Sequence, residues 1–157
     1  MKPPSILFVC LGNICRSPLA EAAMRDAAAR AGMEILVDSA GTGAWHIGRA
    51  PDPRSVAVAG GKGIDISGYK ARQVRGDDFR SFDYVLALDP QNLRDLRKIA
   101  PSDTTARIAL LMDFVPGRAG EGVSDPYYQD AIAFDVVWRD VSAAAEALVE
   151  LVRGDDR

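Results

Sequence analysis

The chain has 157 residues, of which 48% are hydrophobic and 26% are charged, and it carries a formal net charge of -3. This length and composition are typical of one globular domain and exclude collagen-like, low-complexity and intrinsically disordered chains. Nucleic-acid binders expose a basic surface, and this chain has no surplus of basic residues. We therefore expect no nucleic-acid partner.

The cysteine content and the lengths of the apolar runs indicate the cellular compartment of the protein. No run approaches the ~18 apolar residues of a membrane helix, and the apolar stretch before Cys10 is too short for a signal peptide. The two cysteines provide no disulfide framework, and free thiols are typical of a reducing compartment. With His46 as the single histidine, we expect no metal site. The sequence predicts a cytoplasmic protein with no membrane association, no metal and no other cofactor.

Short apolar runs alternate with helical patterns along the chain, which is typical of an α/β sandwich around a parallel sheet. We expect strands at residues 5–9, 34–38, 82–88 and 106–112. We expect helices at residues 18–30, 53–60, 90–99 and 134–152. In the first helix the pattern directs Leu19 and Ala23 to the core, and Glu21 and Arg25 to solvent. The whole chain, residues 1–157, is expected to be one domain.

The segment 10–17 lies between the first strand and the first helix, where ligands bind in open α/β sheets. If its backbone curls with the amides pointing inward, it forms a phosphate-binding loop at the positive end of the helix. Gly12 and Asn13 are the residue types that most readily adopt the left-handed conformation that such a curl needs. Arg16 adds a planar charged group that can hold two phosphate oxygens at once.

Cys10 begins this loop, and a cysteine in such a field is stabilised as a thiolate. The residues alone therefore indicate an ionised nucleophile aimed at a bound anion, with Arg16 on the far side of that anion. They also allow a plainer interpretation, in which Cys10 is a small core residue and Arg16 is solvated.

The sequence resembles the low-molecular-weight protein tyrosine phosphatase family over essentially its whole length. The motifs that carry the resemblance occur in family order and are Cys10-Leu-Gly-Asn-Ile-Cys-Arg-Ser-Pro18, Asp38-Ser-Ala-Gly-Thr42, Ala71-Arg72-Gln73, Phe82-Asp83-Tyr84, Asn92-Leu-Arg-Asp-Leu96 and Asp125-Pro-Tyr-Tyr128. The resemblance implies a three-layer sandwich, with a four-stranded parallel sheet flanked by helices. It also implies hydrolysis of protein phosphotyrosine through a cysteinyl-phosphate intermediate, with no metal.

By this resemblance the loop residues have distinct roles. Cys10 attacks phosphorus, while Arg16 and the loop amides hold the phosphate oxygens. Ser17 donates a hydrogen bond to the cysteine sulfur, although its plainer role is a helix N-cap. Asn13 fixes the loop through hydrogen bonds. The phosphate-binding loop comprises Leu11, Gly12, Asn13, Ile14 and Cys15.

Three Asp-Pro pairs compete for the role of general acid. Asp52 and Asp89 each precede a helical pattern, and an N-cap followed by proline explains both pairs. Asp125 instead precedes Tyr127 and Tyr128, some residues before the last helix. The residues alone leave the choice open, and the match to the family's acid loop assigns the general acid and base to Asp125.

The resemblance also implies a substrate pocket and a redox pair. Trp45, Tyr127 and Tyr128 form aromatic walls around a phenyl ring, although Trp45 has the alternative of an exposed loop residue. Ile14 stands where members that hydrolyse phosphoarginine have threonine, so phosphotyrosine is the expected substrate. Cys15 is similar to a family cysteine that pairs reversibly with the nucleophile Cys10, with a spectator thiol as the alternative.

Two positions depart from the family pattern. Tyr69 replaces a common histidine, and Gly43 replaces a serine that braces the loop asparagine, so we expect Asn13 to be supported differently. His46 is expected at the pocket rim without a catalytic role.

Arsenate reduction on the same scaffold and a non-catalytic phosphate sensor are the alternative functions. The expected partners are phosphotyrosine proteins, with a bacterial tyrosine autokinase suggested by analogy alone. The expected oligomeric state is a monomer or a weak dimer.

Overall fold

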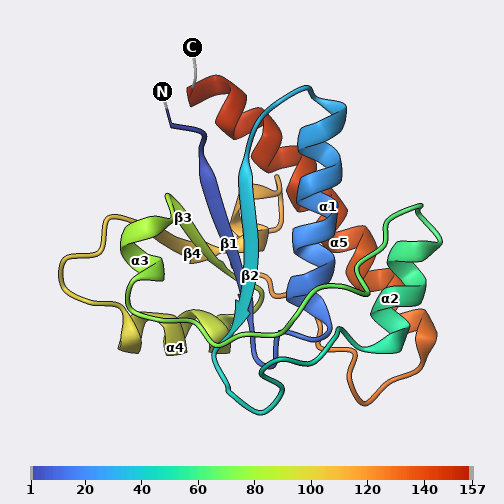
Figure 1. Cartoon of the computed structure of the whole chain (residues 1–157). Coiled ribbons are helices and arrows are strands. Elements are labelled where there is room, and N and C mark those ends of the chain that lie inside the picture. The colour runs from blue at the N-terminus through green and yellow to red at the C-terminus, as the bar shows by residue number, and fades with distance from the viewer. Residues whose placement is uncertain (1, 156–157) are drawn as a thin grey trace.

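Four parallel strands form the centre of the fold (Figure 1). The structure, a computed structural model, describes residues 2–155. The strands lie in the order β2-β1-β3-β4 and are β1 (Ser5–Cys10), β2 (Leu36–Gly41), β3 (Tyr84–Ala87) and β4 (Arg107–Leu110). All three strand pairs are parallel, as the alternation of strands and helices predicts.

Helices cover both faces of the sheet and give the fold three layers (Figure 1). One face carries α1 (Arg16–Arg30), α2 (Pro53–Gly60) and α5 (Ala131–Asp155). The other face carries α3 (Asp78–Ser81) and α4 (Pro90–Ile99), and a 3-10 helix, η1 (Leu111–Phe114), follows β4. The three-layer sandwich expected from the sequence is confirmed.

The side chains of β1 alternate between two hydrophobic cores. Ile6, Phe8 and Cys10 belong to the core shared with α1 and α5. Leu7 and Val9 belong to the core shared with α3 and α4. A central parallel strand is buried on both faces, which explains why β1 is a continuous apolar run.

The strand order places the end of β1 at a topological switch point. The helix that follows β1 packs on one face of the sheet, and the helix that follows β3 packs on the other. Ligands in open α/β sheets bind beyond the carboxyl ends of strands at such a point. Cys10, the last residue of β1, lies there.

Element boundaries differ from the sequence expectation by a few residues. Helix α1 begins two residues earlier than expected, and β2 begins at Leu36 instead of residue 34. Strand β4 ends at Leu110, and the apolar residues after it form η1. The sequence places these residues in the strand, since a buried turn can be as apolar as a strand. The sequence does not predict α3, since four residues are too few to show a helical period. Among the residues described, no helix has the length and apolar composition needed to span a membrane.

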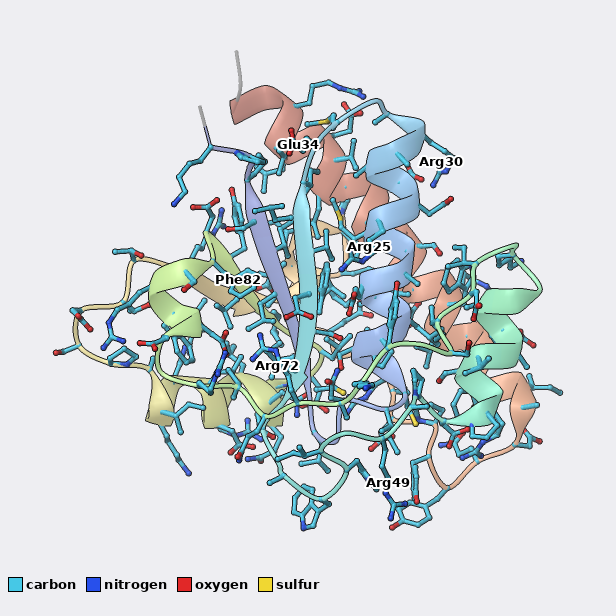
Figure 2. All side chains as sticks on the ribbon, viewed as in Figure 1. Arg25, Arg30, Glu34, Arg49, Arg72 and Phe82 are labelled. Atoms are coloured by element: carbon cyan, nitrogen blue, oxygen red, sulfur yellow. The ribbon has the colours of Figure 1, made fainter. Side chains whose placement is uncertain are left out.

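Glu21 is buried, although the helical pattern directs it to solvent. Its carboxylate accepts hydrogen bonds from Ser39 and from Arg25. Arg25 lies between α1 and β2 (Figure 2) and also donates to the carbonyl of Val37 in β2. Burial raises the pKa of Glu21 above its ordinary value, although the hydrogen bonds from Ser39 and Arg25 oppose the rise. The expectation is wrong because a helical pattern carries no information about a polar partner on the neighbouring strand.

Candidate active site

The loop after β1 has its carbonyl groups turned outward. The carbonyls of Cys10 and Leu11 accept hydrogen bonds from the backbone amides of residues 42–43, each at 2.9 Å. The carbonyls of Ile14 and Cys15 accept hydrogen bonds from the start of α2. In a trans peptide the amide N–H points away from the carbonyl that precedes it, so the amides that follow these four carbonyls point into the loop. The loop is therefore an anion-binding nest at the N-terminus of α1.

Two backbone positions allow the loop to close. Asn13 has a φ of 58°, in the left-handed region that asparagine tolerates better than most residues, as expected. Gly12 does not have a left-handed backbone, so the expectation for Gly12 is wrong. Its small size matters instead, because a Cβ at this position would lie 3.0 Å from the ring of His46. At the end of β2, a Cβ on Gly41 would lie 2.8 Å from the carbonyl oxygen of Leu11. Only glycine at position 41 lets the loop pack against β2.

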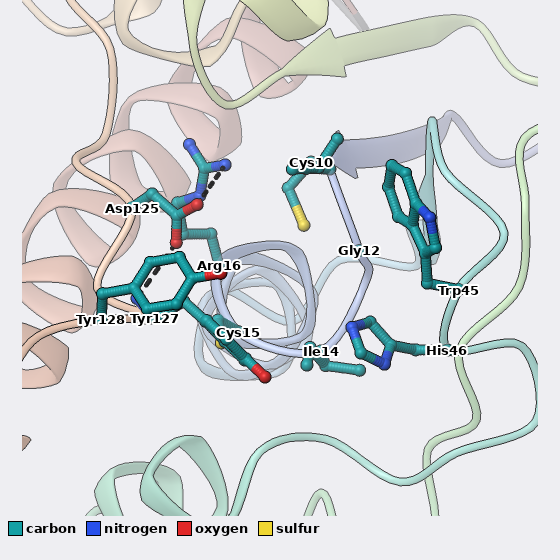
Figure 3. A pocket seen from close by; sticks show the side chains of 11 residues that line it. Cys10, Gly12, Ile14, Cys15, Arg16, Trp45, His46, Asp125, Tyr127 and Tyr128 are labelled. Atoms are coloured by element: carbon teal, nitrogen blue, oxygen red, sulfur yellow. Dashed lines mark hydrogen bonds and ion pairs between the residues drawn. The ribbon is translucent and has the colours of Figure 1, made fainter.

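The sulfur of Cys10 points from the end of β1 into a pocket (Figure 3). Cys10 Sγ lies 2.9 Å from Ser17 Oγ and accepts a hydrogen bond from the amide of Asn13 at 3.3 Å. The residue is buried and packs in the core shared with α1 and α5, yet its sulfur has two polar contacts. Cys10 is therefore a core residue that also lines the pocket, and its role as a nucleophile stays a prediction.

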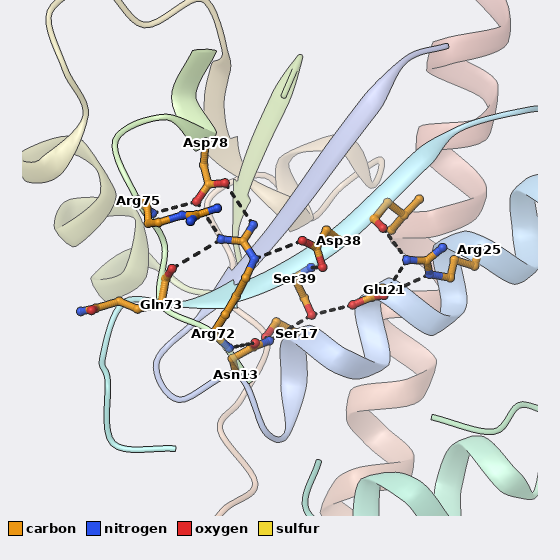
Figure 4. A network of polar contacts seen from close by, with 11 residues as sticks. Asn13, Ser17, Glu21, Arg25, Asp38, Ser39, Arg72, Gln73, Arg75 and Asp78 are labelled. Carbon is orange, nitrogen blue, oxygen red and sulfur yellow. Dashed lines mark hydrogen bonds and ion pairs between the residues drawn. The ribbon is translucent and has the colours of Figure 1, made fainter. Parts of the chain in front are cut away.

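From Ser17, the partner of this sulfur, a chain of hydrogen bonds runs on into β2 and α1 (Figure 4). The Oδ1 atom of Asn13 accepts from the amide of Arg72, so its Nδ2 group must donate, to Ser17 Oγ at 2.8 Å and to Ser39 Oγ at 3.0 Å. Ser39 in turn donates to Glu21 Oε1 at 2.7 Å. Because the lone pairs of Ser17 Oγ receive the Asn13 amide, its hydroxyl proton is free to point at Cys10 Sγ.

Ser17 is not the helix N-cap. Helix α1 begins at Arg16, and the N-cap position is Cys15, which makes no side-chain capping bond. Ser17 lies inside the first turn with no exposed surface, and its hydroxyl serves Asn13 and Cys10. The plainer interpretation of Ser17 is wrong.

Arg16 is a buried cation held between carboxylates. Its side chain is only 3% exposed, and Nη1 donates to Asp89 Oδ2 at 2.6 Å and to the carbonyl of Val123 at 3.0 Å. Its Nη2 lies 3.7 Å from Asp125 Oδ2. Burial opposes the charge of Arg16, but Cys10, Asp89 and Asp125 together raise the pKa of the guanidinium above its ordinary value. Arg16 is not the solvated residue of the plainer interpretation.

The pocket has a volume of about 360 Å³. It gathers the loop, the aromatic residues and the acidic residue expected at the site, and its lining includes Leu11, Ile14, Trp45, Asp125, Tyr127 and Tyr128. Trp45 and His46 lie on one side of Cys10, and Asp125 and Tyr127 lie on the other (Figure 3). The tyrosines pack edge to face, with ring centroids 4.9 Å apart, and Tyr128 is 94% exposed. His46 lies in the lining, as expected.

The three Asp-Pro pairs separate as the sequence indicates. Asp52 and Asp89 are N-caps, accepting the amides of Arg54 and Asn92, and proline follows each cap at the start of the helix. Within residues 2–155, Asp125 caps no helix, and its Oδ1 accepts a single hydrogen bond, from the nearby amide of Tyr127. Its side chain is 46% exposed and lines the pocket.

Cys15 is a buried thiol in the same loop as Cys10, and both thiols are free. Burial, followed by the nearby charge of Asp52, raises the pKa of Cys15 to about 12. Its thiol is therefore protonated at neutral pH.

The sequence pattern does not assign several residues to the site. Asp89 pairs with Arg16 in addition to its predicted role as a cap, and Ser39 and the amide of Arg72 hold Asn13. The brace that Gly43 does not supply thus comes from Ser39. Gly43 has a different effect, since a Cβ there would lie 1.9 Å from the ring of Trp45. The Asp38-Ser-Ala-Gly-Thr42 motif is the only local signal that could have identified Ser39.

Comparisons with known proteins agree with this geometry. The family model described as "Low molecular weight phosphotyrosine protein phosphatase" matches residues 5–157. The low molecular weight protein-tyrosine-phosphatase YfkJ of Bacillus subtilis is 48% identical over 126 residues, which cover 79% of this chain and 81% of that protein. A low molecular weight phosphotyrosine protein phosphatase of Schizosaccharomyces pombe is 42% identical over 136 residues, covering 85% of this chain and 86% of the relative.

A solved structure extends the likeness to the whole fold. The crystal structure of YfkJ matches with a TM-score of 0.92 at 40% sequence identity, and the match covers 100% of this chain and 99% of that one. The chain therefore belongs to the low molecular weight phosphotyrosine protein phosphatase family.

Proposed function

We propose that the protein hydrolyses phosphotyrosine in proteins through a cysteinyl-phosphate intermediate on Cys10. The observation that carries the proposal is the convergence of Cys10 Sγ, the inward amides and Arg16 on one pocket, which Asp125 also lines. A phosphate in the nest has its phosphorus in front of the sulfur and its oxygens on the amides and the guanidinium.

In the first step the Cys10 thiolate attacks phosphorus, an S–P bond forms, and the bond from phosphorus to the phenolic oxygen breaks. Asp125 donates a proton to the departing phenolate. Because Asp89 and Val123 occupy Nη1 of Arg16, the Nε and Nη2 edge is the one available to the phosphate oxygens. The inward amides bind the remaining oxygens, on which charge concentrates in the transition state.

In the second step a water molecule attacks phosphorus, Asp125 accepts its proton, and the S–P bond breaks to return the thiolate. The hydroxyl of Ser17 donates to the sulfur and stabilises the thiolate in both steps, because a hydrogen bond to a charged form favours that form. Asn13 keeps that hydroxyl in place from the other side.

The lining of the pocket supports an aromatic substrate. Trp45, Tyr127 and Tyr128 are amphipathic aromatic side chains around a slot, with Leu11 and Ile14 as its apolar floor. A phosphotyrosine ring fills such a slot, whereas the short stem of phosphoserine leaves it empty. Ile14 cannot donate or accept a hydrogen bond, in agreement with a phenyl group as its neighbour.

The cellular setting is part of the proposal. Two free thiols support a cytoplasmic protein. The partners are phosphotyrosine proteins, and a tyrosine autokinase is a suitable first candidate to test. We propose a monomer or a weak dimer as the working state.

Cys15 supports a proposal of redox protection. Peroxide oxidises the Cys10 thiolate to a sulfenic acid with release of water, and the Cys15 sulfur then displaces the sulfenic oxygen as water to form a disulfide. A thiol reductant restores both cysteines. Recovery with dithiothreitol is expected for the wild-type protein and is expected to be lost in Cys15→Ser.

Steady-state turnover tests the proposed function. Cys10→Ser is expected to abolish hydrolysis of p-nitrophenyl phosphate while vanadate binding persists, since the nest and Arg16 remain. A panel of phosphotyrosine, phosphoserine and phosphoarginine peptides, with arsenate alongside, is expected to favour phosphotyrosine. Residual turnover in Cys10→Ser, or a preference for another substrate, would contradict the proposal.

A further inference from the structure

We infer that Arg54 is a positioning residue that fixes the Asp125 segment against the phosphate-binding loop. The inference rests on the proposed function, because it gives Arg54 its effect through the general acid Asp125. Arg54 itself is not among the residues that line the pocket.

The N-terminus of α2 holds the phosphate-binding loop. The amide of Asp52 donates to the carbonyl of Ile14 at 2.8 Å, and Ser55 Oγ donates to the carbonyl of Cys15 at 3.2 Å. Ser55 is completely buried. Helix α2 is therefore fixed relative to the loop that carries Cys10.

Arg54 extends from the same turn of α2 to the acid segment. Its Nη1 donates to the carbonyl of Gln129 at 2.7 Å, and its Nη2 donates to the carbonyl of Tyr127 at 3.0 Å. Its Nε and Nη2 also hold the two oxygens of Asp52 at 3.0 and 2.9 Å. The guanidinium lies over the ring of Phe134, 4.4 Å from its centroid.

The acid segment depends on this contact. The residues around Asp125 form neither helix nor strand, and the bonds within the segment are local, from Tyr127 to Asp125 and from Gln129 to Pro126. From the rest of the described chain, residues 124–129 receive hydrogen bonds only from Arg54. On the other side of the acid, Val123 is held by the carbonyl of Leu88 and by Arg16. The Tyr127 carbonyl is two residues after Asp125, so Arg54 fixes the C-terminal side of the acid against the loop.

The chemistry of the guanidinium explains why arginine is suited to this position. One edge of its planar fork pairs with Asp52, while its outer N–H groups remain free to reach two carbonyls that face it. Lysine has a single nitrogen at the end of a flexible stem and cannot hold all four oxygens in one plane. A displacement of a catalytic group by 1 Å can cost about 10²-fold in rate.

The test compares two leaving groups in Arg54→Lys. The second step is common to both substrates, so the comparison uses kcat/KM, which reports the first step alone. A general acid contributes about 10²–10⁴-fold, so we expect kcat/KM for phenyl phosphate, a poor leaving group, to fall at least about tenfold. We expect kcat/KM for p-nitrophenyl phosphate to fall less than about twofold, since its phenolate needs little protonation. The inhibition constant of inorganic phosphate is expected to stay unchanged, because the nest is intact.

Three further variants separate the possible outcomes. In the Asp125→Asn background, Arg54→Lys is expected to have no additional effect, because both act on one step. Asp52→Asn keeps an N-cap but removes the charge that orients Arg54, and we expect the same leaving-group-selective loss from it. Arg80→Lys is the control, since Arg80 is likewise a helix arginine paired with aspartate, in its case Asp77 and Asp103, but lies on α3, away from the site.

Equal losses of kcat/KM on both substrates in Arg54→Lys would overturn the inference. A double variant in which the losses from Arg54→Lys and Asp125→Asn multiply would overturn it as well. If Asp125→Asn alone shows no leaving-group selectivity, the assignment of the acid fails first, and the inference fails with it. Circular dichroism checks that each variant is folded at the assay temperature.

Discussion

Asn13 is the residue at which the strain and the hydrogen bonding of the loop can be measured separately. It combines a left-handed backbone with a side chain that is 3% exposed and holds three partners. Asn13→Ala removes the hydrogen bonds and keeps the strain, whereas Asn13→Gly removes both. The two variants therefore differ chiefly in the backbone term.

The expected loss in Asn13→Ala follows from its partners. The amide of Arg72 loses its acceptor and is left unpaired, at about 1–3 kcal/mol. Ser17 and Ser39 each lose one hydrogen bond but keep a second partner, so each loss is near the net value of about 0.5–1.5 kcal/mol. The left-handed conformation costs alanine a further ~1–2 kcal/mol. We expect a total destabilisation of about 3–8 kcal/mol.

Asn13→Gly removes the strain of the left-handed backbone, but glycine gives the unfolded chain more conformational freedom, which costs about 0.5–1 kcal/mol of stability. We therefore expect Asn13→Gly to be more stable than Asn13→Ala by roughly 0.5–1 kcal/mol. Turnover falls in both variants, because the hydroxyl of Ser17 is released from its position beside the sulfur.

Urea unfolding at constant pH measures these free energies. Asn92→Ala is the matched control, since Asn92 is equally buried but sits in a helix, where alanine is favoured, and its Oδ1 has no partner among the described residues. A loss below about 1 kcal/mol in Asn13→Ala, less than one unpaired buried amide costs, would refute the hydrogen-bond argument. A glycine variant no more stable than the alanine variant would refute the strain argument.

Three other expectations concern the rim, the second thiol and the buried acid. Gly43→Ala places a methyl group 1.9 Å from the ring of Trp45, so the ring must move. We expect KM for phenyl phosphate to rise and tryptophan fluorescence to shift, while the inhibition constant of inorganic phosphate stays unchanged. Gly76→Ala is the control, because a Cβ at Gly76 lies in open space, and it should change none of these quantities. Because burial and Asp52 raise the pKa of Cys15 to about 12, formation of a second iodoacetamide adduct, followed by intact mass, should accelerate about tenfold per pH unit between pH 7 and 10. Burial is the main cause that raises the pKa of Glu21 in the folded protein. The free energy of unfolding therefore falls as the pH rises from the unfolded pKa of 4.5 towards the folded pKa. Glu21→Gln should flatten this fall in urea unfolding measured from pH 4 to 7.

The predictable part of the site is the part encoded by neighbours in the chain. The phosphate-binding loop follows from an apolar strand, a short polar segment and a helix start, and the caps at Asp52 and Asp89 follow from the proline beside each. Each of these signals involves residues within one turn or one loop. Their physical basis is local backbone geometry, so the sequence shows them directly.

The unpredicted part consists of contacts between distant segments. Asp89 is 73 residues from Arg16 and Ser39 is 26 residues from Asn13, and no spacing rule joins such pairs. Glu21 illustrates the same limit, because its position on the helix indicates solvent until Ser39 and Arg25 are placed around it. Buried polar groups are satisfied by the tertiary structure, and their partners become visible only in it.

The two carboxylates near Arg16 differ in geometry, and the difference fits the proposed roles of an anchor for Asp89 and a general acid for Asp125. Asp89 is 2.6 Å from Nη1, is 25% exposed and also caps α4, so it is held in one position as the permanent counter-ion. Asp125 is 3.7 Å from Nη2, is 46% exposed and lines the pocket, so an incoming phosphate dianion competes with it for the same guanidinium. In the proposed mechanism Asp125 stands beside the leaving group and donates the proton that the phenolate needs. Asp89 meanwhile keeps the buried guanidinium of Arg16 paired when phosphate occupies the Nη2 edge.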